Sequence, residues 1–295
     1  MAGRRIESSA SRTADMTCAC RAMSFYEPEP ALKGADWVAP KLLPRAIQPL
    51  VIWPPTRKLL QRMMAPEGVY GWVIARTRYI DEALRAACLE GFAQVLLFGA
   101  GFDSRSVRFC SQLRAMRLFE LDAPTTQAMK IEQFRRRGIP IPTNVALVAI
   151  NFEKDSVEQK LAQAGFSRGS KTLVILEGVL QYLNPQSVES TFATIRGLVG
   201  TGSRVVFDHA YAAVVRGEGD LYGQRGITRG VSRVGESWQF GLDDGEVEAF
   251  LQRFGFALVD KKNPQELEQM NFRRADGSLL ARINGTQGLV TAERE

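Results

Sequence analysis

Histidine and cysteine are scarce in this chain. Among its 295 residues there is one histidine, His209, and the four cysteines are scattered without a CxxC pair. Because zinc sites are built from clustered cysteine and histidine side chains, the sequence argues against a structural zinc site, and we expect no metal. The isolated cysteines predict reduced thiols, which are typical of a cytoplasmic protein.

Long apolar runs are also missing. No run of about 18 apolar residues is present, so a membrane-spanning helix is not expected. The N-terminal stretch MAGRRIESSASRTAD is basic, but no apolar core follows it, so we expect no signal peptide. The net charge of +6 lies in short clusters such as residues 135–137, without a nucleic-acid-binding motif. We therefore expect neither nucleic acid nor a membrane as a partner, and a homodimer stays open.

Five short runs rich in valine, isoleucine, leucine and phenylalanine occur between residues 94 and 210. Their apolar residues are nearly continuous, which is typical of strands buried on both faces. Helix-like stretches separate them, so the pattern predicts a doubly wound α/β fold with a mostly parallel sheet. The five runs are QVLLFGAG (94–101), MRLFELD (116–122), NVALVAINF (144–152), KTLVILEG (171–178) and SRVVFDHA (203–210).

Two further runs complete a predicted seven-stranded sheet. We expect ALVDKK (257–262) and SLLARINGTQGLVTA (278–292) to be closing antiparallel strands. The helices predicted between the strands and after them cover residues 104–113, 123–137, 156–164, 185–199 and 243–256.

Two segments fall outside this alternation. Residues 1–92 predict a tail and a helical cap, because residues 27–56 carry seven of the thirteen prolines and residues 70–91 form an amphipathic pattern. Residues 210–242 are long and glycine-rich, which is typical of a lid. We expect residues 93–295 to form the core, with this lid inserted after the fifth strand and the cap in the same domain.

Polar residues end all five runs, which predicts a ligand site along the carboxyl edge of the sheet. The first run ends in GAGFD (99–103), a turn in which Gly99 and Gly101 let a ligand approach the backbone. Asp122 closes the second run, twenty-one residues after Gly101, at a spacing that suits a carboxylate bound to a ribose. This pattern predicts a nucleotide-type cofactor.

The turn departs from the dinucleotide pattern GxGxxG. Ser104 stands where the third glycine would be, and Asp103 enters the loop. Glu120 and Glu177 add acidic groups along the same edge. Because these carboxylates would repel a pyrophosphate and attract a sulfonium and an amine, the edge favours S-adenosylmethionine over NAD.

Several stretches resemble the leucine carboxyl methyltransferase family, most closely its bacterial branch of O-methyltransferases in polyketide-type biosynthesis. The longest are VLLFGAGFDSRSVRF (95–109), FELDAPTTQAMK (119–130) and LVILEGVLQYLNPQSV (173–188), and shorter ones are SRTADMTCACRA (11–22), ARTRYIDEAL (75–84), GESWQFGL (235–242) and FRRADGSLL (272–280). The resemblance runs from about residue 8 to residue 290. It implies a class I, Rossmann-like methyltransferase that uses S-adenosylmethionine, with a cap and a lid.

The resemblance also implies roles for individual residues. Arg76 matches the arginine that binds the methionyl carboxylate, and Arg21 falls near the same cofactor. The family usually has Asp-Leu where this chain has Asn151-Phe152, a pair that can still hydrogen-bond and stack on adenine. The cofactor contacts implied in the core are Gly99, Gly101, Asp122, Asn151, Phe152 and Glu177.

Fewer residues of the sequence indicate where the acceptor of the methyl group would bind. His209 follows the fifth strand and is a candidate general base for a phenol or an alcohol, with a structural histidine as the alternative; a carboxylate acceptor needs no base. Four aromatic residues are candidates for a substrate pocket, and core packing is the equal alternative. They are Tyr182, Tyr211, Trp238 and Phe240.

The function expected is O-methylation of a carboxylate or hydroxyl on a small biosynthetic molecule. A sensor that binds S-adenosylmethionine without catalysis stays open, as does a carboxyl methyltransferase that acts on a protein C-terminus. A NAD-dependent reductase is disfavoured, because the glycine turn does not suit a pyrophosphate.

Overall fold

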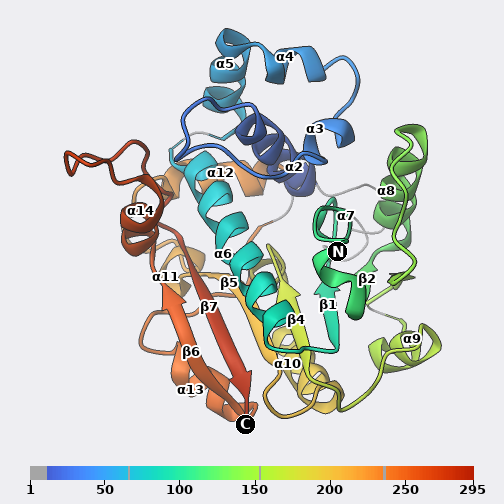
Figure 1. Cartoon of the computed structure of the whole chain (residues 1–295). Helices are drawn as coiled ribbons and strands as arrows, with labels where there is room; N and C mark the ends of the chain where they lie inside the picture. The colour runs from blue at the N-terminus through green and yellow to red at the C-terminus, as the bar shows by residue number, and fades with distance from the viewer. Residues whose placement is uncertain (1–11, 66, 153, 235–236) are drawn as a thin grey trace.

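A seven-stranded sheet runs through the molecule in the order β3-β2-β1-β4-β5-β7-β6 (Figure 1). The computed structural model describes residues 12–65, 67–152, 154–234 and 237–295. The strands are β1 Gln94–Phe98, β2 Arg117–Asp122, β3 Val145–Ala149, β4 Thr172–Leu176, β5 Arg204–Ala210, β6 Phe256–Lys262 and β7 Gln287–Arg294. All five strands expected between residues 94 and 210 are present, and they pair in parallel.

The end of the sheet differs from the prediction in two ways. Only β7 runs against the other strands: it lies between β5 and β6 and is antiparallel to both. The expected strand over residues 278–292 is shorter at its start, because β7 begins at Gln287. In the preceding stretch Leu279 forms only an isolated bridge with Arg273.

Helices cover both faces of the sheet, as a doubly wound fold requires. Val95 and Leu97 of β1 pack in a buried cluster with α6, which spans Val69–Leu89. The alternate residues Leu96 and Phe98 pack on the other face. That face is covered by α9 (Val157–Gln163), α10 (Pro185–Leu198) and α13 (Val247–Arg253). Each central strand is therefore buried on both sides, which accounts for the continuous apolar runs.

Local sequence fixes where several helices begin. The Asn184 side chain accepts a hydrogen bond from the Ser187 N–H at the start of α10, and Pro185 occupies the first turn. A short helix not predicted above, α14 (Pro264–Phe272), begins with a capping box between Asn263 and Glu266. The predicted helix over residues 104–113 is instead α7 (Arg105–Arg108) followed by the 3₁₀ turn η1 (Gln112–Ala115).

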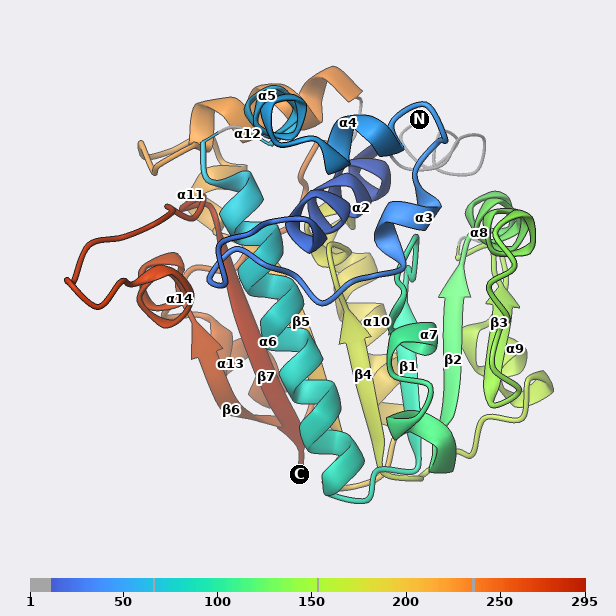
Figure 2. The ribbon, with the colours of Figure 1, turned by 45° about the horizontal axis from the view of Figure 1, so that its top comes forward.

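The N-terminal helices form a cap above the carboxyl ends of the central strands (Figure 2). They are α2 (Arg12–Phe25), α3 (Ala39–Leu42), α4 (Gln48–Ile52) and α5 (Pro54–Met64). Buried residues of the cap, including Met23 and Val51, share one apolar cluster with Trp72 of α6. A tail is expected over residues 1–15, but α2 already begins at Arg12; residues 1–11 lie outside the described residues.

The predicted lid, residues 210–242, is more regular than expected. It contains α11 (Ala212–Val215) and α12 (Gln224–Val234), and residues 235–236 lie outside the described part of the chain. Ile227 of α12 packs against the cap cluster, and an isolated bridge joins Gly241 to Ala210 at the end of β5. The remaining helix, α8 (Pro124–Arg136), follows β2.

Candidate functional site

The glycine turn after β1 meets the end of β2 at the carboxyl edge of the sheet. Gly99 and Gly101 have φ angles of 63° and 49°, in the left-handed region that favours glycine. The Asp122 carboxylate accepts hydrogen bonds from the N–H of Gly101 and, at 2.6 Å, from the N–H of Ala123. Burial raises the pKa of Asp122, and these two hydrogen bonds act in the opposite direction. The turn and this carboxylate thus form one rigid edge, as the sequence predicts.

Glu177, just beyond β4, is held by two guanidinium groups. Arg105 Nη1 lies 2.6 Å from one of its oxygens, and Arg76 Nε lies 3.0 Å from the other. Burial alone would raise the pKa of Glu177, but Arg105 and Arg76 hold it well below its usual range. Arg76 also donates to Asp208 at 2.8 Å, and Asp208 accepts from the Gly178 N–H at 2.6 Å. The ends of β4 and β5 are therefore tied to α6.

Arg105 continues this network toward the glycine turn. It forms ion pairs with Asp103 and, at 2.7 Å, with Asp81 of α6. Arg108 binds the same Asp81 with two nitrogens, at 2.8 and 2.9 Å. The turn after β1 is thereby fastened to α6 by side chains.

The cap enters the network through Arg21 and Asp36. Arg21 Nε lies 2.9 Å from Asp36, and its Nη2 donates to the carbonyl of Phe102 at 2.8 Å. Asp36 also faces Arg108 at 3.5 Å. Burial would raise the pKa of Asp36, but Arg21 and Arg108 lower it. Arg21 therefore lies beside the glycine turn, where the resemblance places it.

Among the residues that the structure describes, this network has more negative than positive groups. Four guanidinium groups, from Arg21, Arg76, Arg105 and Arg108, face five carboxylates, from Asp36, Asp81, Asp103, Glu177 and Asp208. Ionised throughout, these nine described groups carry one net negative charge. Because the groups are largely buried, this charge is poorly screened and favours a cationic ligand at the edge.

The end of β3 presents an aromatic ring to solvent. The Phe152 side chain is 48% exposed and stacks on Phe98, with ring centroids 6.2 Å apart and 28° between the planes. The backbone N–H of Asn151 donates to Asp155 at 2.9 Å. The predicted adenine contacts thus lie at the same edge as the glycine turn, with the ring of Phe152 open to a flat ligand.

Glu120, which the sequence places among the acids of the edge, points into the protein. Its carboxylate lies 2.6 Å from Lys130 Nζ, and both side chains are almost wholly buried. Burial raises the pKa of Glu120, and Lys130 opposes that shift. This pair supports β2 and α8 from inside and contributes no open carboxylate to the edge.

His209 and Tyr211 project from the other face of β5. Val206 packs with α6 and Asp208 binds it, whereas Phe207 packs with α10 and α13. Because side chains alternate along a strand, His209 lies on the α10 and α13 side. There its ring packs edge-on against Tyr211, and its Nδ1 lies 3.0 Å from the Ala210 carbonyl. The structure therefore does not bring His209 together with the residues of the glycine turn.

The other aromatic candidates divide between the edge and the core. Tyr182 belongs to the 3₁₀ turn η2 (Leu180–Tyr182), directly after β4. The N–H of Gln239 donates to the Gln181 carbonyl at 2.7 Å, so the segment that carries Trp238 lies against η2. Phe240 is buried and packs on Phe250 of α13. The segment around Trp238 thus lies beside Tyr182, whose carbonyl accepts from the Gln239 side chain at 3.1 Å, while Phe240 is a core residue.

Five members of the network were not singled out as site residues by the sequence analysis: Asp36, Asp81, Arg105, Arg108 and Asp208. Asp208 was visible as a polar strand end, and Arg105 and Arg108 fall within the stretch 95–109 that resembles the family. Asp81 gave no signal, because an acid on a long helix usually faces solvent. Its role depends on Arg105 and Arg108, which follow it by more than twenty residues.

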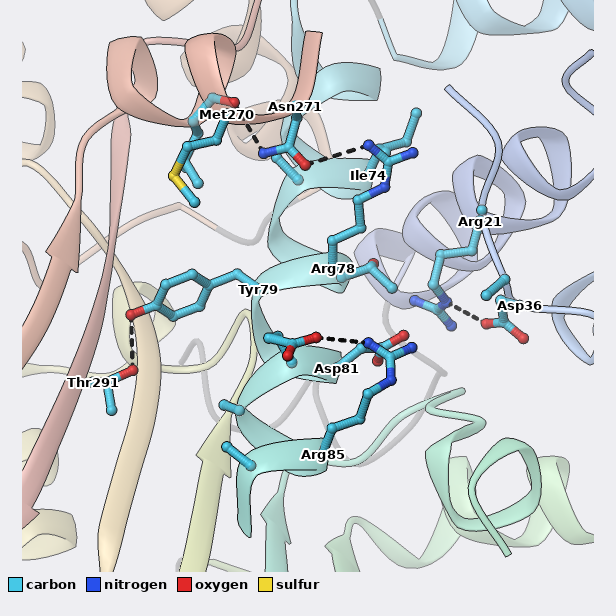
Figure 3. Close-up of a pocket in the computed structure, with 18 of the residues that line it drawn as sticks. Arg21, Asp36, Ile74, Arg78, Tyr79, Asp81, Arg85, Met270, Asn271 and Thr291 are labelled. Carbon is cyan, nitrogen blue, oxygen red and sulfur yellow. Dashed lines mark hydrogen bonds and ion pairs between the residues drawn. The ribbon is translucent and has the colours of Figure 1, made fainter. Parts of the chain in front are cut away.

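A second hollow lies away from this edge, along α6 (Figure 3). Its volume is about 660 Å³, and its lining includes Arg78, Arg85 and Met270, with Arg21 and Asp36 at one side. Arg21 is the only predicted cofactor residue that lines it. Across it, Tyr79 hydrogen-bonds to Thr291 at 2.8 Å, and Arg78 donates to Asn271 at 3.3 Å. The hollow is separate from the glycine turn.

The described residues contain neither a cluster suited to hold a metal ion nor a helix suited to cross a membrane. In that part of the chain no three His, Cys, Asp or Glu side chains are arranged to hold a metal ion. None of the helices described above is both long and apolar enough to cross a membrane.

Comparison with known proteins places the chain in a family. The family model described as leucine carboxyl methyltransferase matches residues 16–196, more than half of the chain. YktD of Bacillus subtilis (strain 168), named as an S-adenosyl-L-methionine-dependent methyltransferase, is 24% identical over 225 residues, which cover 73% of this chain and 74% of YktD. Franean1_4929 of Parafrankia sp. (strain EAN1pec), named in the same way, is 32% identical over 200 residues, covering 68% of this chain and 63% of that protein.

A solved structure shows the same fold. It is the crystal structure of a protein of Thermobifida fusca YX described as a methyltransferase, with a TM-score of 0.60 and 16% identity. The match covers 92% of this chain and 97% of that chain. Together with the family model, which spans the cap, the glycine turn and the end of β4, these likenesses lead to one conclusion: the chain belongs to the leucine carboxyl methyltransferase family.

Proposed function

We propose that this chain binds S-adenosylmethionine at the carboxyl edge of β1, β2 and β4 and transfers its methyl group to an oxygen of a small biosynthetic molecule. The observation that carries the proposal is the turn from Gly99 to Gly101, set between the carboxylates of Asp122 and Glu177. Family membership supports methyl transfer, and the names of the two relatives support the choice of cofactor.

The residues at this edge fit such a cofactor. A methyl group added at Gly101 would lie 3.5 Å from the side chain of Ala14, an ordinary contact distance, so the turn faces α2 of the cap without a clash. Asp122 offers a carboxylate to the ribose, and the exposed ring of Phe152 offers a flat apolar surface to adenine. The net negative charge of the network suits a ligand that carries a sulfonium and an amine.

Arg76 and Glu177 are placed to hold the amino-acid end of the cofactor. Arg76 offers guanidinium donors to a carboxylate, while it keeps its ion pair with Asp208. Glu177 and Asp103 offer acceptors to an amine. When bound, S-adenosylmethionine supplies an already activated methyl group, so the protein's task is to align the acceptor and exclude water.

The acceptor is proposed to lie beside η2, next to the glycine turn. Val179 approaches Gly99 so closely that a methyl group added there would lie 3.0 Å from its side chain, and η2 follows directly. Beside it, Gln181 Oε1 and Trp238 Nε1 are buried and have no hydrogen-bond partner among the described residues. Buried polar atoms of this kind are candidates for contact with a ligand. With Tyr182 they suit an acceptor that has both an aromatic or apolar body and a polar group.

The position of His209 favours a carboxylate as the accepting group. A carboxylate is ionised at neutral pH and needs no base, whereas a phenol or an alcohol benefits from one. His209 lies on the α10 and α13 face of β5, opposite to Asp208 and the network. We retain it as the candidate base if the acceptor proves to be a phenol.

The cofactor site is tested by Asp122→Asn, measured by calorimetry with S-adenosylhomocysteine. Loss of a charge-assisted contact should weaken binding by about 1.5–3 kcal/mol, roughly tenfold to a hundredfold. The matched control is Asp276→Asn, because Asp276 is exposed and also accepts a backbone N–H, that of Ser278. NAD that binds as tightly as S-adenosylhomocysteine would contradict the proposal, and so would an unchanged affinity in Asp122→Asn.

Transfer itself is tested with radiolabelled S-adenosylmethionine and a panel of small carboxylic acids, phenols and peptides with free C-termini. A labelled product that mild alkali releases is an ester, and a stable one is an ether. Label on a peptide would instead indicate a protein carboxyl methyltransferase. Tight cofactor binding with no transfer to any member would favour a sensor over an enzyme.

A further inference from the structure

Helix α5 turns two polar side chains inward. Arg57, which is buried, lies 3.2 Å from a Glu27 oxygen, and Gln61 donates to the same oxygen at 2.6 Å. Arg57 also donates to the Ile52 carbonyl at 2.9 Å. Because these inward positions are one turn apart, they lie on the face that packs on the cap, together with Leu60.

The outward face of α5 alternates apolar and basic side chains. Lys58, Leu59, Arg62 and Met63 follow the helical spacing of three and four residues, and all four are exposed. Leu59 is 56% exposed and Met63 71% exposed. An exposed apolar residue is ordinary by itself, but two on successive turns of one face form a patch.

The corner between α4 and α5 extends this patch. Ile52 is 50% exposed and Trp53 60% exposed, the latter at the residue that precedes α5. Pro54 and Pro55 follow at once and restrict the backbone, so the tryptophan is presented from a stiff turn. Figure 1 shows α4 and α5 at the top of the molecule, beyond α2 and away from the sheet. We call Ile52, Trp53, Lys58, Leu59, Arg62 and Met63 the cap face.

The segment that carries the cap face has charge of one sign. Residues 37–65 include five basic residues and no aspartate or glutamate. Arg57 is buried against Glu27, and the other four are exposed. They are Lys41, Arg45, Lys58 and Arg62. A surface that combines tryptophan, long apolar side chains and basic residues without acids is complementary to an anionic lipid surface.

We propose that the cap face docks the protein on anionic membranes as a peripheral contact. Trp53, Leu59 and Met63 enter the boundary between headgroups and acyl chains, and the basic side chains remain with the lipid phosphates. A second copy of the chain fits the face less well, because a twofold contact sets the same patch against itself and brings Lys58 and Arg62 against like charges. From the sequence we expected no membrane partner, because the chain lacks a spanning segment. A peripheral contact needs no such segment.

Vesicle binding tests the proposal on the whole protein. Vesicles of phosphatidylcholine with about one third phosphatidylglycerol are compared with vesicles of pure phosphatidylcholine, by co-sedimentation at low and at high salt. We expect binding to the anionic vesicles only, and weaker binding at high salt, because the attraction is partly electrostatic. Binding to neither kind of vesicle overturns the proposal.

Two variants locate the contact. Leu59→Asp with Met63→Asp removes the apolar anchors, and Lys58→Glu with Arg62→Glu reverses the charge; each pair should lower binding by roughly tenfold or more. The controls are Met270→Asp, at an exposed apolar residue of α14, and Arg273→Glu with Arg274→Glu, at exposed arginines after α14. All substituted side chains are exposed, so thermal unfolding should stay close to that of the parent protein.

A spectroscopic readout separates docking from unfolding. Brominated lipid should quench the fluorescence of the parent protein, and most of that quenching should disappear in Trp53→Phe with binding retained. If the cap-face variants bind vesicles as the parent does, the proposal is wrong. If Leu59→Asp with Met63→Asp instead abolishes a concentration-dependent dimer, and vesicles do not bind, the face is an interface between two copies.

Discussion

His209 is a candidate general base by residue type, but its side chain is buried away from the ionic network. It is the single histidine of the sequence and follows directly on Asp208, which belongs to the ionic network. Yet the two side chains leave opposite faces of β5, because neighbours on a strand alternate. Its ring is 2% exposed, packs on Tyr211 and is hydrogen-bonded at Nδ1 with the Ala210 carbonyl.

Burial of His209 predicts a dependence of stability on pH. Burial lowers its pKa below the ordinary value of about 6.5, so the unfolded state binds more protons below that pH. The stabilisation is present above pH 6.5 and is lost as pH falls through the folded pKa, at a slope of at most about 1.4 kcal/mol per pH unit. Urea unfolding of the parent and of His209→Asn between pH 7.5 and 5 measures it. Because there is no second histidine, equal pH profiles in the two proteins would contradict the prediction.

Single residues also show how far the site could be predicted. The glycine turn and Asp122 follow from local spacing, so they were found from the sequence. The charged network joins α6, the turn after β1 and the end of β4, and its partners lie far apart in sequence: Asp81 and Arg105 differ by 24 positions, Arg105 and Glu177 by 72. Such pairing depends on tertiary structure, and an arginine or an acid alone does not indicate its partner.

The predicted lid, residues 210–242, shows the same limit of prediction from sequence for whole elements. Glycines made residues 210–242 resemble an irregular loop, but they serve close packing. A methyl group added at Gly226 would lie 2.2 Å from Glu67 Oε2, and one at Gly223 would lie 2.1 Å from Asn284 Nδ2. Strands β1 to β5, by contrast, were predicted well because burial on both faces gives them continuous apolar sequences. Helix α14 was missed, although its capping box is a local signal.

The contact between the end of the predicted lid and β5 depends on Gly241. A methyl group there would lie 2.8 Å from the Ala212 nitrogen and 2.9 Å from the Ala210 oxygen, both backbone atoms. Gly241→Ala should therefore cost about 1–3 kcal/mol and loosen the end of the lid. We expect faster proteolysis within residues 210–242 and a raised KM for the acceptor, with the affinity for S-adenosylhomocysteine little changed.

The matched control is Gly245→Ala, since a methyl group at Gly245 has no neighbour within 4 Å. Equal proteolysis and equal KM values in the two variants would show that the bridge between Gly241 and Ala210 is not needed to hold residues 210–242.

At the scale of the whole molecule, the cap and the sheet are joined by charge and by apolar packing. Arg21 and Asp36 connect the cap to the turn after β1, while Cys18 and Cys20 of α2 are buried in the apolar cluster shared with α6. A ligand at the turn would lie between these two contacts. Opening of the cap should therefore expose the two thiols and the cofactor site together.

Thiol labelling measures that opening. Burial raises the pKa of Cys18 and Cys20 to about 12, so they should stay unreactive in the native protein at pH 8, whereas the exposed Cys110 should react at once. Saturating S-adenosylhomocysteine should slow the labelling of Cys18 and Cys20 without affecting Cys110. The double variant Cys18→Ser with Cys20→Ser should lack the slow phase of labelling, which assigns that phase to these two thiols. Rapid labelling of Cys18 and Cys20 together with Cys110 would mean that the cap is not closed; the fourth thiol, Cys88, is half-buried in α6.

The position of β7 has a consequence for how the chain is made. β7 separates β5 from β6, and β6 pairs with β7 but not with β5. On the ribosome, β6 emerges before the strand that will hold it, and residues 263–286 must follow before β7 can appear. Until then the edges of both β5 and β6 are open to other chains, which makes this interval the one in which a nascent chain is most prone to aggregate and most in need of a chaperone.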